Sequence, residues 1–185
     1  MTAGPEREPE PGPLEPPVLV SACLLGLNTR YNAVPVENED MLRLARERRI
    51  LPLCPEQLGG LPTPREPASI VGGGGEDVLD GRARVVTASG RDVTEAFLRG
   101  AQETARLARL AGVRRAYLKS RSPSCGAGEL RNLAGGLDVG DGVTAALLGR
   151  MGIEVVACEA VPRRAAALEG LRALPRVGRV GNESP

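Results

Sequence analysis

Residues 18–23 read VLVSAC, a short apolar run followed closely by a cysteine. Each of the other three cysteines also comes shortly after such a run. The four pairs are Val18–Ser21 with Cys23, Ile50–Leu53 with Cys54, Ala116–Leu118 with Cys125, and Ile153–Val156 with Cys158. Apolar runs of this length are typical of buried parallel strands. Because open α/β sheets bind ligands at the carboxyl ends of their strands, we predict sulfur ligands gathered at one edge of a sheet.

Segments with helical periodicity alternate with these strands, and we expect helices at about 40–48, 92–111, 141–151 and 162–173. This alternation of strands and helices predicts a three-layer α/β fold with a mostly parallel, Rossmann-like sheet. Asp92-Val93-Thr94-Glu95 resembles a capping box at the start of the clearest helix. A Gly- and Pro-rich stretch and the Asp80-Gly81 pair predict an inserted β-hairpin. We interpret Gly72–Gly75 as a flexible loop, because the rest of a phosphate-binding loop pattern is absent.

The length of 185 residues favours a single domain. Residues 1–17 alternate Glu and Pro and are expected to be a disordered tail, residues 18–173 to form the domain, and residues 174–185 to form a flexible tail. No apolar stretch is long enough to span a membrane, and the first residues are unlike a signal peptide. We therefore expect a cytoplasmic protein with no membrane partner, and the sequence leaves its oligomeric state open.

The composition excludes several classes of chemistry. The chain has no histidine, which removes Ser-His-Asp and Cys-His catalysis and every metal site that uses imidazole. Its net charge of +1 argues against a strongly basic nucleic-acid binder, although a local arginine patch could still hold a phosphate. Aromatic residues make up only 2% of the chain, so base-stacking platforms are not expected.

In a reducing compartment four cysteines are more often free, catalytic or metal-binding than paired as disulfides. No Cys-x-x-Cys pair is present to form a zinc ribbon. One interpretation is four unrelated buried thiols, because free cysteine is among the most buried residues. The turn-forming residues around Cys23, Cys54 and Cys125 instead favour thiols exposed at the ends of strands. Three thiolates brought together can hold three irons of a [4Fe-4S] cluster and leave the fourth iron open.

Five blocks of the sequence carry a resemblance to a known family. They are VSACLLG at 20–26, CPE at 54–56, GGL at 59–61 with Pro64-Arg65, KSRSPSCG at 119–126, and GDGVT at 140–144. Together, over about residues 18–156, the chain resembles the DUF523 family, which includes the thiouracil desulfurases. The resemblance implies an enzyme that uses a [4Fe-4S] cluster to remove sulfur from thiolated uracil or thiouridine, with release of sulfide and no net redox change. The substrate would be a thiolated pyrimidine as a free base or nucleoside, or thiolated RNA.

Carried over by position, the resemblance makes Cys23, Cys54 and Cys125 the cluster ligands. Cys158 lies outside the matching blocks, and we expect it to be a spectator, with a role as fourth ligand as the alternative. A fourth thiolate would close the open iron.

Other residues near these cysteines are candidates for catalysis. Glu56 could transfer a proton or activate a water, and its alternative role is to cap a loop or pair with Arg65. Ser122 and Ser124 could orient the substrate or donate to a developing sulfide, and their alternative role is hydrogen bonding within a turn.

Three cations are candidates for substrate binding. Arg65 and Arg121 could contact a phosphate or carbonyl oxygen, and Lys119 could grip a phosphate or neutralise the cluster's negative charge. Ala33 occupies a position where the family generally has glycine. If the loop needs a positive φ there, alanine is expected to shift its path and the substrate preference with it.

Two functions of other classes compete with desulfuration. An iron–sulfur module could store or relay sulfide or electrons without a substrate of its own, and Cys158 would then be a fourth ligand. A cluster-free nucleoside-binding or phosphorolytic enzyme would use the cysteines only in its core.

Overall fold

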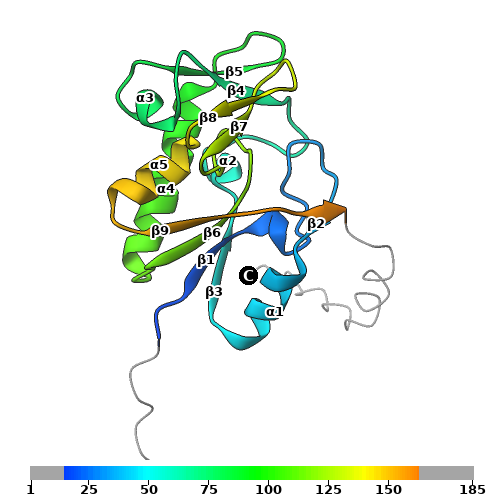
Figure 1. Ribbon diagram of the computed structural model, residues 1–185, viewed down its shortest axis with the longest axis vertical. Coiled ribbons are helices and arrows are strands. Elements are labelled where there is room, and N and C mark those ends of the chain that lie inside the picture. Colours follow the sequence, from blue (N-terminus) through cyan, green and yellow to red (C-terminus); the bar gives the residue numbers. More distant parts are fainter. Residues whose placement is uncertain (1–14, 163–185) are drawn as a thin grey trace, which may run out of the picture.

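A four-stranded parallel sheet forms the centre of the molecule (Figure 1). The computed structural model describes residues 15–162. The strands lie in the order β3-β1-β6-β9, with β1 at Val18–Ser21, β3 at Ile50–Leu53, β6 at Arg115–Lys119 and β9 at Glu154–Cys158. All three pairings are parallel, which confirms the predicted α/β class.

Helices cover both faces of this sheet, so the fold has three layers. On one face Leu19 of β1 belongs to a core shared with α4 (Thr94–Leu110) and α5 (Val143–Arg150). On the other face Val20 packs with α1 (Glu39–Glu47). Neighbouring residues of β1 thus enter different cores, because successive side chains of a strand point to opposite faces.

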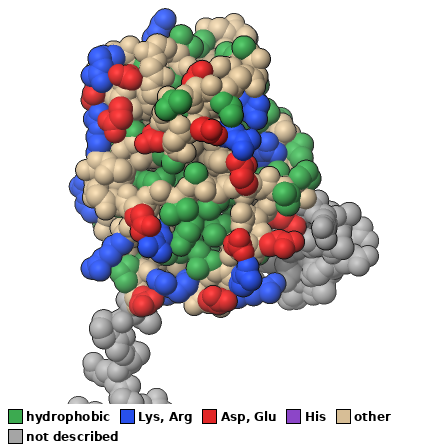
Figure 2. Space-filling view, in the orientation of Figure 1, with side chains coloured by type: hydrophobic (Ala, Val, Ile, Leu, Met, Phe, Trp, Pro, Cys, Tyr) green, Lys and Arg blue, Asp and Glu red, His purple; other side chains and the backbone are tan. Residues whose placement is uncertain are grey.

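The α1 face is covered less completely than the opposite face. Figure 2 shows apolar side chains gathered at the surface on this side of the molecule, with charged side chains around them. Several apolar side chains of the sheet are only partly buried on this side, namely Ile50, Tyr117 and Val156.

Smaller elements surround the sheet. The helices are α2 (Pro55–Leu58), α3 (Gly75–Leu79) and a 3-10 turn at Ala22–Leu24. Three antiparallel pairs are β2 (Val36–Glu37) with β10 (Val161–Pro162), β4 (Ala68–Val71) with β5 (Arg84–Thr87), and β7 (Glu129–Arg131) with β8 (Leu137–Val139). No helix of the described residues is long and apolar enough to cross a membrane.

The inserted hairpin is present, but the prediction of a tight turn at Asp80-Gly81 was wrong. β4 and β5 pair antiparallel, and the link between them contains α3, whose Val78 is buried in the core. Asp80-Gly81 ends α3 instead, with Gly81 at φ +74°. Asp-Gly pairs suit both positions, because a helix end and a tight turn each need a residue with positive φ. The Gly72–Gly75 segment enters α3 and is anchored there, since the Gly75 amide donates to the Asp141 carbonyl at 2.6 Å.

The start of α4 also differs from the expected capping box. Val93 occupies the N-cap position, and the Asp92 carboxylate accepts from the Thr94 amide at 2.9 Å. The Thr94 hydroxyl accepts from the Val85 amide at 2.9 Å, which ties the helix to β5. Pro162 lies in β10 and not at the start of a helix, and the rest of the helix expected at 162–173 lies outside the described residues. Residues 1–14 and 174–185, where tails were expected, lie outside them as well.

A close crossing of α2 and α4 sets the position of the chain just after Cys54. A Cβ atom on Gly100 of α4 would lie 2.0 Å from the Pro55 carbonyl oxygen, and one on Gly59 would lie 2.0 Å from the Ala96 carbonyl oxygen. Only glycine allows the two backbones to approach this closely.

We predict that Gly100→Ala lowers the free energy of unfolding by at least about 2 kcal/mol, because the new methyl group meets backbone that cannot rotate away. The matched control is Gly149→Ala in α5, where nothing lies within 4 Å of the added Cβ. That control is expected to raise stability by roughly 0.5–1 kcal/mol. Urea unfolding followed by circular dichroism measures both, and equal effects would contradict the close crossing.

Candidate functional site

A pocket of about 620 Å³ opens where the carboxyl ends of β1, β3 and β6 meet, and Cys23, Cys54 and Cys125 all line it. Ser21 is paired with Leu53 in the register of β1 and β3, so Cys23 and Cys54 leave the sheet side by side. Cys125 lies in the loop after β6. Three cysteines that are far apart in the sequence therefore share one pocket.

The first turn of α5 holds the loop that carries Cys125. The amides of Gly142, Val143 and Thr144 donate to the carbonyls of Gly126, Pro123 and Ser124 at 2.8, 2.9 and 2.9 Å. These loop carbonyls satisfy amides that have no partner inside the helix. Gly142 has to be glycine at this contact, since a Cβ atom would lie 2.5 Å from the Ser124 carbonyl carbon. The helix start and the cysteine loop thus form one rigid unit.

The two candidate serines have different environments. Ser122 lines the pocket, and its hydroxyl accepts from the amides of Ser124 at 3.2 Å and Cys125 at 3.1 Å. Ser124 is buried and does not line the pocket, and its hydroxyl lies 2.9 Å from that of Thr144. The structure brings Ser122 to the site and leaves Ser124 behind the turn.

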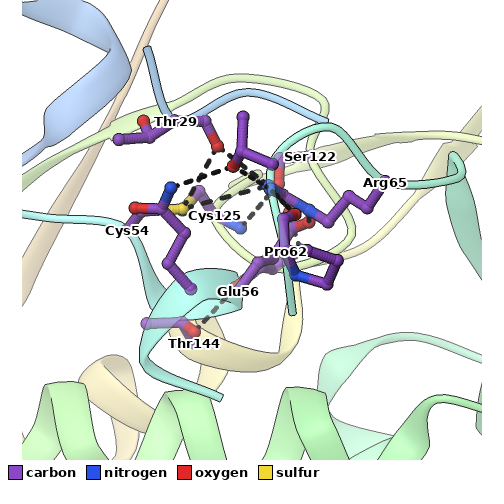
Figure 3. Close-up of polar contacts among 11 residues, drawn as sticks. Thr29, Cys54, Glu56, Pro62, Arg65, Ser122, Cys125 and Thr144 are labelled. Atoms are coloured by element: carbon purple, nitrogen blue, oxygen red, sulfur yellow. Dashed lines mark hydrogen bonds and ion pairs between the residues drawn. The ribbon is translucent and has the colours of Figure 1, made fainter. Parts of the chain in front are cut away.

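Glu56 lines the pocket two residues after Cys54 and pairs with Arg65. Its Oε2 accepts from Arg65 Nε at 2.6 Å, with the Glu56 and Arg65 side chains only 15% and 5% exposed. Figure 3 shows the Arg65 guanidinium reaching toward the residues around Cys54. The ion pair that the sequence left as an alternative role for Glu56 is present in the structure.

All five N–H donors of Arg65 are engaged within the protein. Beyond Glu56, its Nη1 donates to the Pro62 carbonyl and the Thr63 hydroxyl, both at 3.0 Å, and its Nη2 donates to the Thr29 carbonyl at 3.0 Å and Cys54 Sγ at 3.9 Å. A guanidinium has five N–H donors, so none is left for a substrate. This geometry therefore does not favour the substrate-binding role predicted for Arg65.

Lys119 and Arg121 line the pocket together with Glu159, which sequence reasoning missed. Glu159 Oε1 accepts from Arg121 Nη2 at 2.6 Å, and its Oε2 lies 3.8 Å from Lys119 Nζ. Arg121 has φ +57°, and its buried Nε has no hydrogen-bond partner among the described residues, with the Glu129 carboxylate 3.7 Å away. Glu159 follows β9 directly at the same sheet edge as the cysteines, which was the signal available in the sequence.

Burial disfavours the charged forms of the three thiols in this pocket and of Lys119. It raises the pKa of the Cys23 thiol to about 11, with a further contribution from the neighbouring Cys54. Burial also raises the pKa of Cys54 and of Cys125, and it lowers the pKa of Lys119. The three thiols therefore favour their neutral forms unless a positive centre binds them, and metal binding is what converts such thiols to thiolates.

The donor set fits an iron–sulfur cluster. Three sulfurs with no imidazole form a soft site, the kind that Fe–S clusters occupy. Among the residues from 15 to 162, no three His, Cys, Asp or Glu side chains converge on a single-ion site. A cubane cluster instead binds each sulfur to a different iron.

Cys158 is separate from the other three cysteines. It is paired with Lys119 in the sheet register, packs with Val20 and Met41 in the core under α1, and does not line the pocket. Cys158 thus lies outside the pocket that the other three cysteines line.

Ala33 does adopt the positive φ that the loop was suspected to need. Its φ is +54°, and its amide donates to the Arg30 carbonyl at 3.0 Å. The loop keeps this conformation with alanine, at a cost of about 1–2 kcal/mol for a side chain in the left-handed region. Arg30 and Tyr31 of the same loop line the pocket.

Cysteines from three strand ends of a parallel α/β sheet, backed by a buried carboxylate–guanidinium pair, define a candidate cysteine-ligated cofactor site. Comparison with known proteins agrees with this class. The chain belongs to the 2-thiouracil desulfurase family, whose model matches residues 18–160.

Two relatives extend the comparison. The uncharacterized protein YbbK of Bacillus subtilis (strain 168) is 48% identical over 141 residues, which cover 75% of this chain and 93% of YbbK. The solved structure of the [4Fe-4S]-dependent thiouracil desulfidase TudS (DUF523Vcz) matches with a TM-score of 0.68 and 42% identity. That match covers 77% of this chain and 91% of TudS.

We predict that Ala33→Gly raises the free energy of unfolding by about 0.5–1 kcal/mol, because relief of the strained φ outweighs the entropy that glycine adds to the unfolded chain. Ala45→Gly within α1 is the control and should lower stability by about 1 kcal/mol. Denaturant unfolding of the two variants checks both signs. A loss of stability in Ala33→Gly would show that the loop is not strained.

Proposed function

We propose that this protein hydrolyses the carbon–sulfur double bond of a thiolated uracil at a [4Fe-4S] cluster held by Cys23, Cys54 and Cys125. The observation that carries the proposal is the convergence of these three cysteines, from three strand ends, on one pocket. Membership of the 2-thiouracil desulfurase family and the likeness to TudS support it.

Cys23, Cys54 and Cys125 would hold the cluster, which would supply Lewis-acid chemistry at an iron without a protein ligand. The protein contributes the three sulfurs, each set by a different part of the fold. Cys158 lies in the apolar core away from this pocket, so we propose that it is not a fourth ligand.

The reaction exchanges sulfur for oxygen without electron transfer. The oxygen of a water bonds to the ring carbon, the carbon–sulfur bond breaks, and both water protons end on the departing sulfide. Glu56 is the group that takes a proton from the attacking water and returns it to the sulfur, since its carboxylate lines the pocket beside Cys54. Arg65 holds that carboxylate by one oxygen, Oε2, in the ion pair described above.

Ser122 and the two rim cations orient the substrate. The Ser122 hydroxyl accepts two amide bonds, and its own hydrogen remains available to the pocket. Lys119 and Arg121 can contact a substrate oxygen or phosphate at the rim. For Ser124 we propose a structural role in the turn, in place of the catalytic role expected from the sequence.

The substrate we propose is a small thiolated pyrimidine, as the free base or the nucleoside. A pocket of about 620 Å³ exceeds the size of a pyrimidine ring and leaves room for a sugar. The near-neutral net charge of +1 favours small molecules over thiolated RNA. The four free cysteines are consistent with a reducing, cytoplasmic location.

We predict that Cys23→Ala, Cys54→Ala and Cys125→Ala each lose the broad absorption band at about 400 nm and the turnover of thiouracil. Each variant removes one sulfur from the pocket. Cys158→Ala is the matched control and is expected to keep both. Anaerobic purification with iron and sulfide quantitation measures the cluster, and sulfide release measures turnover.

Three outcomes of that experiment would contradict the proposal in different ways. Full turnover by Cys54→Ala would exclude three-cysteine ligation. A cluster without turnover in the unaltered protein would favour the iron–sulfur module. Protein that holds no cluster would indicate that the cysteines have only a structural role.

We predict that Glu56→Gln keeps the cluster but lowers kcat by about 100-fold to 10,000-fold, the range expected for loss of a proton-transfer group. The control is Glu76→Gln, which also removes a carboxylate paired with an arginine, Arg150, but lies outside the pocket. Steady-state kinetics with matched iron content distinguish them. A kcat equal to that of the control would remove Glu56 from the mechanism.

A further inference from the structure

The buried guanidinium of Arg65 joins three separate segments around one sulfur. Its partners are the carbonyl of Thr29, the side chains of Cys54 and Glu56, and the turn at Pro62-Thr63. The Arg65 amide also donates to the Tyr31 carbonyl at 2.7 Å, so backbone and side chain both hold the 29–31 loop. Figure 3 shows Thr29, Cys54, Glu56 and Pro62 around the Arg65 guanidinium.

We propose that Arg65 is a positioning residue that orients the Cys54 sulfur and the Glu56 carboxylate together and keeps a positive charge against that sulfur. The inference rests on the proposed function, because it assigns Arg65 a role toward a cluster ligand and a proton-transfer group. It differs from a substrate-binding role, which would need a free donor.

The contacts of the Cys54 thiol show why the sulfur needs an N–H donor from Arg65 once the thiol has lost its own hydrogen. Cys54 Sγ lies 3.6 Å from the Thr29 carbonyl oxygen, to which the thiol can donate its hydrogen. When the thiol gives up that hydrogen to bind metal, sulfur and carbonyl oxygen become two acceptors facing each other. Arg65 Nη2 contacts both atoms, at 3.9 and 3.0 Å, and can donate to each. The guanidinium therefore compensates the repulsion that ligation creates.

The same group sets the direction of the Glu56 carboxylate. Nε binds Glu56 Oε2 while Nη2 faces Cys54 Sγ, so one rigid plane fixes the sulfur relative to the carboxylate. A lysine ammonium could supply the charge but has only three donors and no planar fork. Arginine is thus the side chain that can satisfy all of these acceptors at once.

A positive charge and an N–H donor beside a ligand sulfur favour the more reduced cluster, since hydrogen bonds and net charge set the potentials of iron–sulfur centres. Removing them is expected to lower the reduction potential. This readout is independent of turnover.

The test compares Arg65→Gln and Arg65→Lys with Arg99→Gln in anaerobically reconstituted protein. Arg99 is the matched control, because its Nε donates to the Gly59 carbonyl at the end of α2 at 3.1 Å and contacts neither Cys54 nor Glu56. Circular dichroism checks that each variant folds, and iron content checks that the cluster is loaded. Redox titration followed by electron paramagnetic resonance gives the midpoint potential of the cluster. Steady-state kinetics give kcat and KM.

For Arg65→Gln we expect a lower midpoint potential and a kcat reduced by about 10-fold to 100-fold at equal iron content, with KM little changed. Arg65→Lys should retain more of the potential than of kcat, because it restores the charge without the fork. Arg99→Gln should match the unaltered protein in all three quantities.

A midpoint potential and kcat in Arg65→Gln equal to those of the control would overturn the proposal, and a rise in KM alone would return Arg65 to substrate binding. If both Arg65 variants fail to fold, Thr63→Val removes one acceptor of Nη1 and must shift potential and kcat in the same directions, to a smaller extent. If the unaltered protein holds a cluster but does not turn over thiouracil, the proposed function fails while the shift in potential still decides the role of Arg65.

Discussion

Parallel pairing of β3, β1 and β6 is the constraint on which the site depends. Parallel strands end at the same edge, so a cysteine placed shortly after each strand arrives in a common pocket without any sequence proximity. Contacts with helices then fix the backbone position of two of these cysteines. The glycine crossing of α2 and α4 sets the chain after Cys54, and the first turn of α5 sets the loop of Cys125. The pocket is thus built on closely packed elements.

The electrostatics of the pocket complement this rigidity. The three thiols prefer their neutral form, whereas the side chains of Glu56 and Arg65 are held together by a short ion pair. Breaking a buried pair leaves an uncompensated charge and is costly, so this pair is a fixed feature of the site. The cationic iron–sulfur core of a bound cluster would supply the compensation that the thiols lack, and the Arg65 guanidinium would then face a thiolate. Lys119, Arg121 and Glu159 also line the pocket, and their side chains are more exposed than those of the Glu56–Arg65 pair.

Much of the architecture followed from short patterns. The four strands and three of the expected helices lie where the periodicity of the sequence placed them, because buried strands and amphipathic helices leave strong local signals. The local signals failed where one motif suits two structures. Asp80-Gly81 ended a helix instead of forming a hairpin turn, and the capping-box pattern at Asp92 gave way to a contact between Thr94 and β5. In the first case Val78 of α3 is buried in the core, and in the second Thr94 bonds to Val85 of the preceding strand.

The sequence by itself determined which residues could be ligands, their order along the chain, and the α/β class, because these depend on residue type and local periodicity. Only the tertiary structure decided how the donors are shared among acceptors. It placed Ser122 in the pocket but Ser124 behind the turn, and Cys158 in the apolar core. It also gave every donor of Arg65 to the protein, including the carbonyl of Thr29, 36 residues away. A hydrogen bond requires two groups to meet in space, and that meeting depends on how the strands and helices pack rather than on the residues beside each group in the chain.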